Sequence, residues 1–463
     1  MSVSSEVPLT FVVQAYRFAL DPTADQVAML RSHCGAQRFA FNWALRLISA
    51  NLRQRAAERS YGIDETDLTP ALGWSAYELR KRWNQAKGEI APWWWENSKE
   101  AYSSGIANLS IALTNWSTSS SGDRRGPRVR FPRFKSRKTH ASCRFTTGVI
   151  GLSTKDRRHV KLPRIGTVRT CESTRKLARR LDAGTARIRS ATVSFRHGRW
   201  FVSFSVEVAK NSRKPDRTDG VVGVDLGVRH LAVLSEPVRG LTDSAGMLPN
   251  PKHLDRVRKK MRRLQRQAAR RRLAGKSRPN TEPSKRLQST NRRIARLYAK
   301  VTQARSESLH QLTATLASRF GTVVVEDLNV AGMLRNRRLS RSIADAGWGE
   351  LRRQLSYKVR WNGGALVVAD RWYPSSKTCS NPRCGVVKAK LHLSEREFRC
   401  EHCGLVIDRD RNAARNLARL AVRMAERPPR VAGRRKTSPL EIRVSPATRS
   451  AEDTATGTPR AVR

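Results

Sequence analysis

The sequence contains few acidic residues and no long apolar run. Only 38 of its 463 residues are Asp or Glu, against 91 Lys or Arg. No apolar run approaches the 18 residues that a membrane-spanning helix needs, and the chain lacks a charged N-terminal region followed by an apolar one. We therefore expect neither a membrane protein nor a secreted one. In the cytoplasm its seven cysteines would stay reduced.

The excess of basic residues gives a formal net charge of +53. Such a charge repels itself in a compact protein, and contacts with phosphates that release counterions are the natural compensation. A surface that only aids solubility would mix charges of both signs. We therefore expect nucleic acid as the partner and a place beside the nucleoid, with a membrane surface as the alternative. The length and the 39% hydrophobic content allow two or three cores.

Acidic residues stand within or at the ends of predicted core elements. Residues 322–325 form a β-branched apolar run that ends in Glu326, and residues 221–227 form a second apolar strand that carries Asp225 within it. Residues 408–416 are typical of a helix start with acids in its first turn. Carboxylates brought together by folding would bind Mg²⁺ or Mn²⁺ and support phosphodiester hydrolysis by two metal ions. The alternative is that these acids cap helices or pair with arginines.

The residues around these acids resemble a known family. GVDLGVRHLAVLS, VVVEDLNVAGM, YPSSKTCS and IDRDRNAARNLARL, in this order, resemble the three RuvC-like nuclease motifs of the TnpB (OrfB) proteins of bacterial insertion sequences, relatives of the type V CRISPR effectors. The resemblance is strong over residues 219–420 and looser elsewhere. It makes Asp225, Glu326 and Asp410 the catalytic acids that bind two Mg²⁺ or Mn²⁺ ions. The family's third acid stands two positions before Asn-Ala-Ala, which selects Asp410 and leaves Asp408 as the second choice.

The resemblance implies RNA-guided cleavage of double-stranded DNA next to a short flanking motif. The guide RNA would be transcribed from the end of the transposable element itself, and pairing with it would choose the target. Three alternatives stay open: a compact type V CRISPR effector, a guide-independent transposase or nuclease, and a binding module without nuclease activity. The oligomeric state is also open, with a monomer favoured.

Four cysteines have the spacing of a zinc site. They occur as C-x4-C, fifteen residues, then C-x2-C, with a glycine after each second cysteine. In a reduced compartment this pattern indicates a structural, tetrahedral zinc ion. The first spacing is longer than usual, and His392 or His402 could substitute as a ligand. The four predicted ligands are Cys379, Cys384, Cys400 and Cys403.

The N-terminal half has a different pattern. Residues 9–18 predict a strand. Asp21 predicts a helix N-cap with Pro22 at the first helical position, and residues 23–115 predict a helical bundle. Residues 191–195 and 200–206 flank His-Gly-Arg and predict a β-hairpin. YRFALDPTADQ and AQRFAFNWAL resemble the family's N-terminal segment, which implies a small β-barrel with an inserted helical recognition lobe.

Several segments are candidates for nucleic-acid contact. Residues 117–138 read as a basic loop, and residues 255–320 as two basic helices interrupted at 275–284, although a solvated linker or a solvated helix face is the alternative. The serines and lysine of YPSSKTCS contact nucleic acid in one interpretation and form a simple turn in the other. Successive tryptophans at 93–95 would point about 100° apart on a helix, so we expect two in the core and one at an interface, with base stacking as the alternative. The predicted contacts are Arg133, Lys135, Arg262, Arg263, Arg270 and Lys377.

The predicted fold is a multidomain α+β protein. An RNase H-like (RuvC) α/β nuclease domain carries an inserted zinc module and follows a small β-barrel with an inserted helical lobe. The boundaries are 1–21 and 139–210 for the barrel, 22–138 for the helical lobe and basic loop, 218–425 for the nuclease domain, 371–407 for the zinc module, and 426–463 for a disordered basic tail.

Overall fold

The computed structural model describes residues 10–124, 126–137, 140–154, 156–210, 214–273, 283–392 and 394–426. The predicted disordered tail, beyond Glu426, lies outside them, as does most of the predicted break at 275–284. Within these ranges no helix is long and apolar enough to cross a membrane.

The elements of the N-terminal half are β1 (Thr10–Asp21), α1 (Ala24–Ser60), α2 (Ala76–Ile90), the 3-10 helix η1 (Trp94–Glu96), α3 (Lys99–Ser120), β2 (Ser142–Phe145), β3 (Gly151–Leu152), β4 (His159–Leu162), β5 (Gly166–Thr170), α4 (Arg175–Asp182), β6 (Ala186–Arg196) and β7 (Arg199–Lys210).

The C-terminal half begins at Arg217. Its elements are β8 (Arg217–Asp225), β9 (His230–Leu234), β10 (Met247–Pro249), α5 (His253–Leu273), α6 (Lys285–Arg319), β11 (Phe320–Glu326), α7 (Val330–Met333), α8 (Ser340–Ala346), α9 (Trp348–Trp361), β12 (Ala365–Ala369), β13 (Glu397–Arg399), β14 (Val406–Asp408) and α10 (Arg409–Glu426).

The N-terminal half contains a seven-stranded antiparallel sheet. Its order is β2-β6-β7-β1-β5-β4-β3, and in the described part of the chain its edge strands β2 and β3 do not pair with each other. The predicted hairpin is confirmed: β6 and β7 are joined by His197 and Gly198, both with positive φ, as a two-residue type I′ turn requires. Among the described residues, the pairings thus form a sheet that is open at β2 and β3, in place of the closed ring that the word barrel implies.

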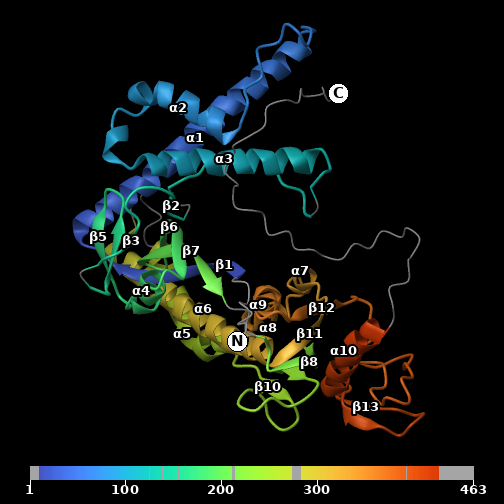
Figure 1. Cartoon of the computed structure of the whole chain (residues 1–463). Helices are drawn as coiled ribbons and strands as arrows, with labels where there is room; N and C mark the ends of the chain where they lie inside the picture. Colours follow the sequence, from blue (N-terminus) through green and yellow to red (C-terminus); the bar gives the residue numbers. More distant parts are fainter. Residues whose placement is uncertain are drawn as a thin grey trace, which may run out of the picture. The chain divides into compact units, whose positions relative to one another are not determined.

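Three α-helices and the 3-10 helix η1 stand between β1 and β2 in the chain, and Figure 1 labels the three α-helices. The predicted helix start at Asp21 is wrong, because Asp21 still belongs to β1 and Thr23 is the N-cap. The Thr23 side chain accepts a hydrogen bond from Gln26 N while Gln26 Oε1 accepts one from Thr23 N, which is a capping box. The predicted loop also begins too early, since α3 continues to Ser120. The helices bury leucines and aromatics such as Leu30, Leu109 and Tyr102.

Only one of the three tryptophans, Trp94, packs against the core, so the expectation of two in the core is wrong. They follow the end of α2, where η1 makes a tight turn. Trp93 is 41% exposed and Trp95 59% exposed, while Trp94 is half-buried with the Lys87 ammonium 3.8 Å from its ring centre. Because the chain leaves the α-helix before the first tryptophan, the helical spacing used to place them does not apply.

The C-terminal half is built on a mixed five-stranded sheet in the order β10-β9-β8-β11-β12. β8, β9 and β10 form an antiparallel meander, whereas β11 runs parallel to both β8 and β12. The register pairs Val325 with Val224. Asp225 and Glu326 are therefore next to each other at the carboxyl ends of adjacent parallel strands, which lie side by side in Figure 1.

Helices pack on both faces of this sheet. Successive residues of a strand point to opposite faces. Val323 and Val325 pack in one cluster with Leu312 and Leu316 of α6 and Leu351 and Leu355 of α9. Val324 packs in another cluster with Leu417 of α10. A Cβ added at Gly223 of β8 would lie 2.0 Å from the Ala414 carbonyl oxygen, so α10 touches the strand backbone and its first turn is carried to the acidic edge.

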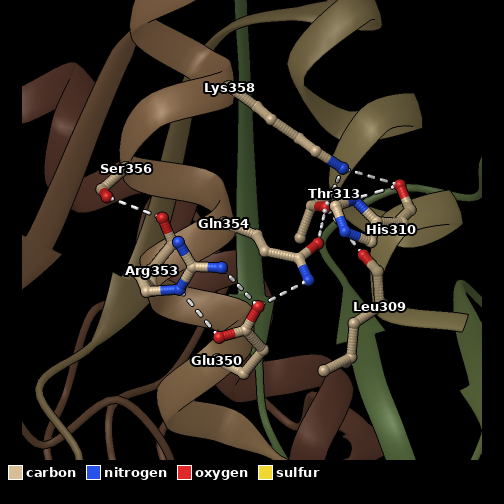
Figure 2. A network of polar contacts seen from close by, with 8 residues as sticks. All are labelled: Leu309, His310, Thr313, Glu350, Arg353, Gln354, Ser356 and Lys358. Atoms are coloured by element: carbon tan, nitrogen blue, oxygen red, sulfur yellow. Dashed lines mark hydrogen bonds and ion pairs between the residues drawn. The ribbon is translucent and has the colours of Figure 1, made fainter. Parts of the chain in front are cut away.

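A chain of polar contacts joins α6 to α9 (Figure 2). Lys358 Nζ donates to the His310 carbonyl at 2.9 Å and to Thr313 Oγ1 at 2.7 Å, although burial lowers the pKa of Lys358 to about 8. Gln354, fully buried, accepts from Thr313 and donates to Glu350, which pairs with Arg353. These contacts satisfy buried polar atoms and fix α9, the helix that carries Arg352 to the site described next.

Candidate active site

Four carboxylates from three distant segments gather at the edge of the five-stranded sheet. Asp225 ends β8, Glu326 ends β11, Asp408 ends β14 and Asp410 is in the first turn of α10. Burial first, and then the charges of Glu326 and Asp410, raise the pKa of Asp225 well above its ordinary value. The three acids named from the sequence are thus close enough to act on one another electrostatically.

Asp408 and Asp410 differ in their hydrogen bonds. Asp408 Oδ1 accepts from the backbone N–H of Asp410 at 3.0 Å and of Arg411 at 3.1 Å, so Asp408 caps α10. Over the ranges that the structure describes, the Asp410 carboxylate has no hydrogen bond or ion pair. Capping occupies one oxygen of Asp408, whereas both oxygens of Asp410 remain free to bind a cation, which favours Asp410 over the second choice.

Glu326 and Asp327 are consecutive acids with different surroundings. Asp327 Oδ1 accepts from Arg352 at 2.6 Å and Oδ2 from Arg371 at 2.7 Å. Burial opposes the charge of Asp327, but these two arginines outweigh it and keep its pKa below the ordinary value. Glu326 has no arginine partner in the described part of the chain. Its Oε1 accepts a 2.5 Å hydrogen bond from Ser375 Oγ.

The loop after β12 is tied to α10 by two buried asparagines. Asn412 Nδ2 donates to the Thr378 carbonyl, and Asn416 Nδ2 donates to the carbonyls of Thr378 and Ser375. Asn412 Oδ1 also accepts from Ser380 N at 3.0 Å. The helix that carries Asp410 therefore holds the loop that presents Ser375 to Glu326.

A cavity of about 360 Å³ opens beside the acidic edge. Glu326, Asp327 and both of the arginines that hold Asp327 line it, together with the α9 residue Trp348, whose buried indole N–H has no hydrogen-bond partner in the described residues. The cavity gives Glu326 an open side, with guanidinium groups next to it that suit a phosphate.

We expect Ser375 to position Glu326 in the nuclease reaction that the family resemblance implies, which gives a first prediction. The replacement Ser375→Ala removes the donor to Glu326 and is expected to lower the cleavage rate about tenfold, because the carboxylate loses its fixed orientation. A change of only about 1 kcal/mol in the free energy of unfolding is expected for one lost hydrogen bond. Ser376→Ala in the same turn is the matched control, and cleavage time courses of both variants with denaturation curves are the measurement. Equal rates for the two variants would contradict the assigned role.

The four predicted cysteine ligands cluster. Their Sγ atoms all lie within 4.8 Å of one another, and the Cys379–Cys403 and Cys384–Cys400 sulfur pairs are 3.5 and 3.7 Å apart. A tetrahedral zinc ion with Zn–S bonds of about 2.3 Å needs sulfurs about 3.8 Å apart. Backbone N–H groups, Leu405 first, lower the pKa of Cys403 to about 7, whereas burial raises the pKa of Cys379 to about 12, so Cys403 is the thiol of this pair that more readily forms the thiolate. His402 Nδ1 lies 3.6 Å from one of these sulfurs, and a fifth ligand is not needed.

The predicted nucleic-acid contacts are found in two kinds of surroundings. Arg262, Arg263 and Arg270 are exposed on α5, and Arg133 is exposed in the segment before β2. The other two predicted contacts are lysines already engaged within the fold: Lys135 Nζ is 3.6 Å from the ring centre of Phe41, and Lys377 Nζ donates to the Ala389 carbonyl. All six remain predictions.

The sequence reasoning missed several residues of the site. Arg352 and Arg371 carry no local signal for their pairing with an acid on another element. Asn412 and Asn416 served only as landmarks in the sequence. Ser375 lies in a turn, as one of the two interpretations expected, but it is 4% exposed and its bond to Glu326 was not foreseen.

Comparison with known proteins identifies the family. Family profiles match three parts of the chain: a helix-turn-helix domain at residues 12–56, a family described as probable transposase (OrfB) at 203–337, and the Cas12f1-like TNB domain at 348–417. Several bacterial relatives bear the name "Putative RNA-guided DNA endonuclease". Rv2885c of Mycobacterium tuberculosis is 38% identical over 94% of this chain and 91% of its own length, and InsQ of Escherichia coli K12 is 29% identical over 88% and 91%.

Among solved structures, a Cas12f1–sgRNA–target DNA complex aligns with 88% of this chain and 99% of its own, at 14% identity and a TM-score of 0.47. The sequence relatives, and not this distant structural likeness, establish the class. The chain belongs to the TnpB (OrfB) family.

Proposed function

We propose that this protein is an RNA-guided DNA endonuclease of a transposable element. The observation that carries the proposal is the meeting of Asp225, Glu326 and Asp410, from three segments far apart in the chain, at one edge of a sheet. The relative of 38% identity named as an RNA-guided DNA endonuclease covers this whole region, and its name supplies the guide and the substrate. The guide would come from the element's own end, and the substrate would be double-stranded DNA beside a short flanking motif.

The acidic cluster fits divalent metal ions. Its carboxylates are hard oxygen donors, and burial together with the neighbouring acids raises the pKa of Asp225 although the charge of Arg409 opposes this, so a bound cation would be stabilised there. Two Mg²⁺ or Mn²⁺ ions bound there would supply a nucleophilic water and stabilise the leaving oxygen of the phosphodiester. Asp225, Glu326 and Asp410 would hold the ions, while Ser375 orients Glu326 and the pair of arginines around Asp327 keeps that carboxylate out of the metal set.

The architecture we propose is an RNase H-like nuclease domain with a zinc module. Support comes from the strand order β10-β9-β8-β11-β12, an antiparallel meander extended by two parallel strands, with acids at the ends of the two central ones. The four cysteines would hold one structural Zn²⁺ and leave no open position for catalysis. β14 leads from this module directly into the cap of α10, so the module would steady Asp410.

The positive charge completes the proposal. A protein with 91 Lys and Arg residues can neutralise many phosphates of a guide RNA and its target. The exposed arginines of α5 would form one phosphate-binding surface, since few acids accompany them. Pairing with the RNA would choose the sequence, so the protein itself needs to recognise only backbone shape and a short motif.

The test is to express the protein with its native flanking DNA, purify it and sequence the RNA that accompanies it. One discrete RNA that spans the end of the gene is expected, and treatment of the complex with RNase should stop DNA cleavage. Expression without the flanking DNA is the control. A random sample of cellular RNA, together with Mg²⁺-dependent cutting that survives RNase, would instead show a nuclease directed by protein alone.

A further inference from the structure

A second cavity, of about 660 Å³, lies among the helices of the N-terminal half. Its volume falls in the range of pockets that enclose small molecules, roughly 300–1,000 Å³. One wall is α1, and the end of α2, the turn after it and the segment before β2 supply the rest. The lining residues are Ser32, Gly35, Ala36, Arg38, Phe39, Asn42, Trp43, Arg46, Ile90, Trp93 and Phe134. We call it the aromatic cavity.

The walls of the aromatic cavity are fixed from behind. Phe39 packs edge-on against Trp93 with ring centres 5.4 Å apart, and Trp43 packs edge-on against the buried Trp83 at the same distance. In contrast, Trp93 is 41% exposed and Phe134 is 62% exposed. Rings that are rigidly supported on one side and open on the other are suited to stacking on a flat, polar-edged partner.

Phe134 is held at the cavity by the residue that follows it. Lys135 N donates to Asn42 Oδ1 at 2.8 Å, and Asn42 Nδ2 donates to the Lys135 carbonyl at 3.0 Å. The Lys135 ammonium sits over the Phe41 ring. This double hydrogen bond and cation–π contact dock the segment on α1, so the exposure of Phe134 is a fixed feature of the cavity.

The rim of the aromatic cavity is positively charged. Arg38 and Arg46 both line it, and neither forms an ion pair or a hydrogen bond within the described ranges of the chain. No acidic residue is among the lining residues. Two unpaired guanidinium groups beside open aromatic rings match a phosphate next to a base, whereas an apolar peptide would leave the arginines without partners.

We infer that the aromatic cavity binds one unpaired nucleotide of a nucleic-acid strand. The base would stack on Trp93 and Phe134, and Arg38 and Arg46 would contact the flanking phosphates. A base inside a duplex is already stacked and cannot enter, so the site selects an unpaired position. RNA and DNA offer the same chemistry here. The inference rests on the proposed function in so far as the protein must bind nucleic acid.

Gly35 provides a way to fill the cavity without removing a contact. It lies on α1, and an added Cβ would meet only the Arg38 guanidinium, at 4.0 Å. Gly35→Leu should therefore place a side chain in the cavity while favouring the helix. Gly88→Leu is the matched control, because Gly88 is exposed on α2 with nothing within 4 Å of an added Cβ. Phe134→Ala is a second test, with Phe11→Ala, at 64% exposure on β1, as its control.

The measurement is the dissociation constant of the full-length protein at one salt concentration for three ligands. They are a single-stranded 12-nucleotide RNA, a single-stranded DNA of the same sequence, and the blunt duplex of that DNA with its complement. Gly35→Leu and Phe134→Ala are expected to weaken binding of at least one of the two single strands about tenfold, the scale of one stacked base, and to leave duplex binding unchanged. A loss confined to the RNA or to the DNA strand identifies the source of the nucleotide, and an equal loss for both single strands shows a site that accepts either. Both control variants should bind like the wild type.

Three results would overturn the site: wild-type affinity in both test variants, equal loss for single strand and duplex, or equal loss in the controls. Melting curves verify that each variant is folded. The binding measurement with these oligonucleotides requires neither a guide RNA nor cleavage. Failure of the aromatic cavity and failure of RNA guidance therefore give different results. A protein that copurifies with a discrete RNA but is unaffected by Gly35→Leu would keep the proposed function and lose only the aromatic cavity.

Discussion

Replacing Asp225 by Asn is expected to abolish DNA cleavage, with a loss of about a thousandfold or more, while binding of RNA stays nearly intact. The carboxylate is close enough to Glu326 and Asp410 for their charges to raise its pKa, and without it the proposed metal ions would not be held in the geometry that hydrolysis needs. Because the substitution lies at the sheet edge and keeps the size of the side chain, the basic surfaces are unchanged. Cleavage and RNA-binding assays on the same preparation measure both effects.

The same variant should be more stable than the wild type when metal is absent. The folded-state pKa of Asp225 lies above its ordinary value of 3.8, so the wild-type protein loses stability as the pH rises from that value through the raised pKa. Asn removes this contribution. Mg²⁺ should raise the melting temperature of the wild type and not of the variant.

Asp327→Asn is the matched control, and its expected effect on the free energy of unfolding has the opposite sign. Its pKa is lowered by the two arginines that flank it, so this substitution should cost about 1–2 kcal/mol of unfolding free energy. It should also leave the Mg²⁺ response in place. Substantial cleavage by the Asp225 variant, or loss of the Mg²⁺ response in both variants, would contradict the metal assignment.

The second large effect is expected at the cysteine cluster. Cys400→Ser should remove one Zn²⁺ per chain, unfold the segment around 379–403 and abolish cleavage, because Asn412 and Ser375 depend on the loop held there. Structural zinc contributes about 10–16 kcal/mol to folding in small zinc peptides, far more than the few apolar residues of this segment can replace. Metal analysis by mass spectrometry and hydrogen exchange of the segment are the measurements.

Cys171→Ser is the matched control for this prediction, since Cys171 is an exposed cysteine outside the cluster. It should keep its zinc, its exchange pattern and its activity. Zinc at one ion per chain in the Cys400 variant, or equal losses in both variants, would show that the cluster does not bind the metal.

The central strands and their acids could be predicted because the pattern is local. The apolar runs before Asp225 and Glu326 are buried strands. The spacing of the four cysteines was by itself enough to predict that their sulfur atoms cluster. The hairpin at His197 was predictable for the same reason, since two residues determine the turn.

The supporting contacts could not be predicted because they join distant segments. The sequence does not show that Asp327, next to Glu326, pairs with Arg352 and Arg371, which lie 25 and 44 residues later. The bond from Ser375 to Glu326 spans 49 residues and has no sequence signal. The tryptophans were misplaced because a helical period was applied where the helix had already ended.

The most direct test of the account is to replace the guide segment of the copurified RNA and map where the complex cuts. The account predicts that in Mg²⁺ the cut follows the new guide to a matching DNA sequence beside the same flanking motif, and that the complex with Asp225→Asn binds that DNA without cutting it. Cleavage that stays at the old sequence, or that needs no RNA, would contradict RNA guidance.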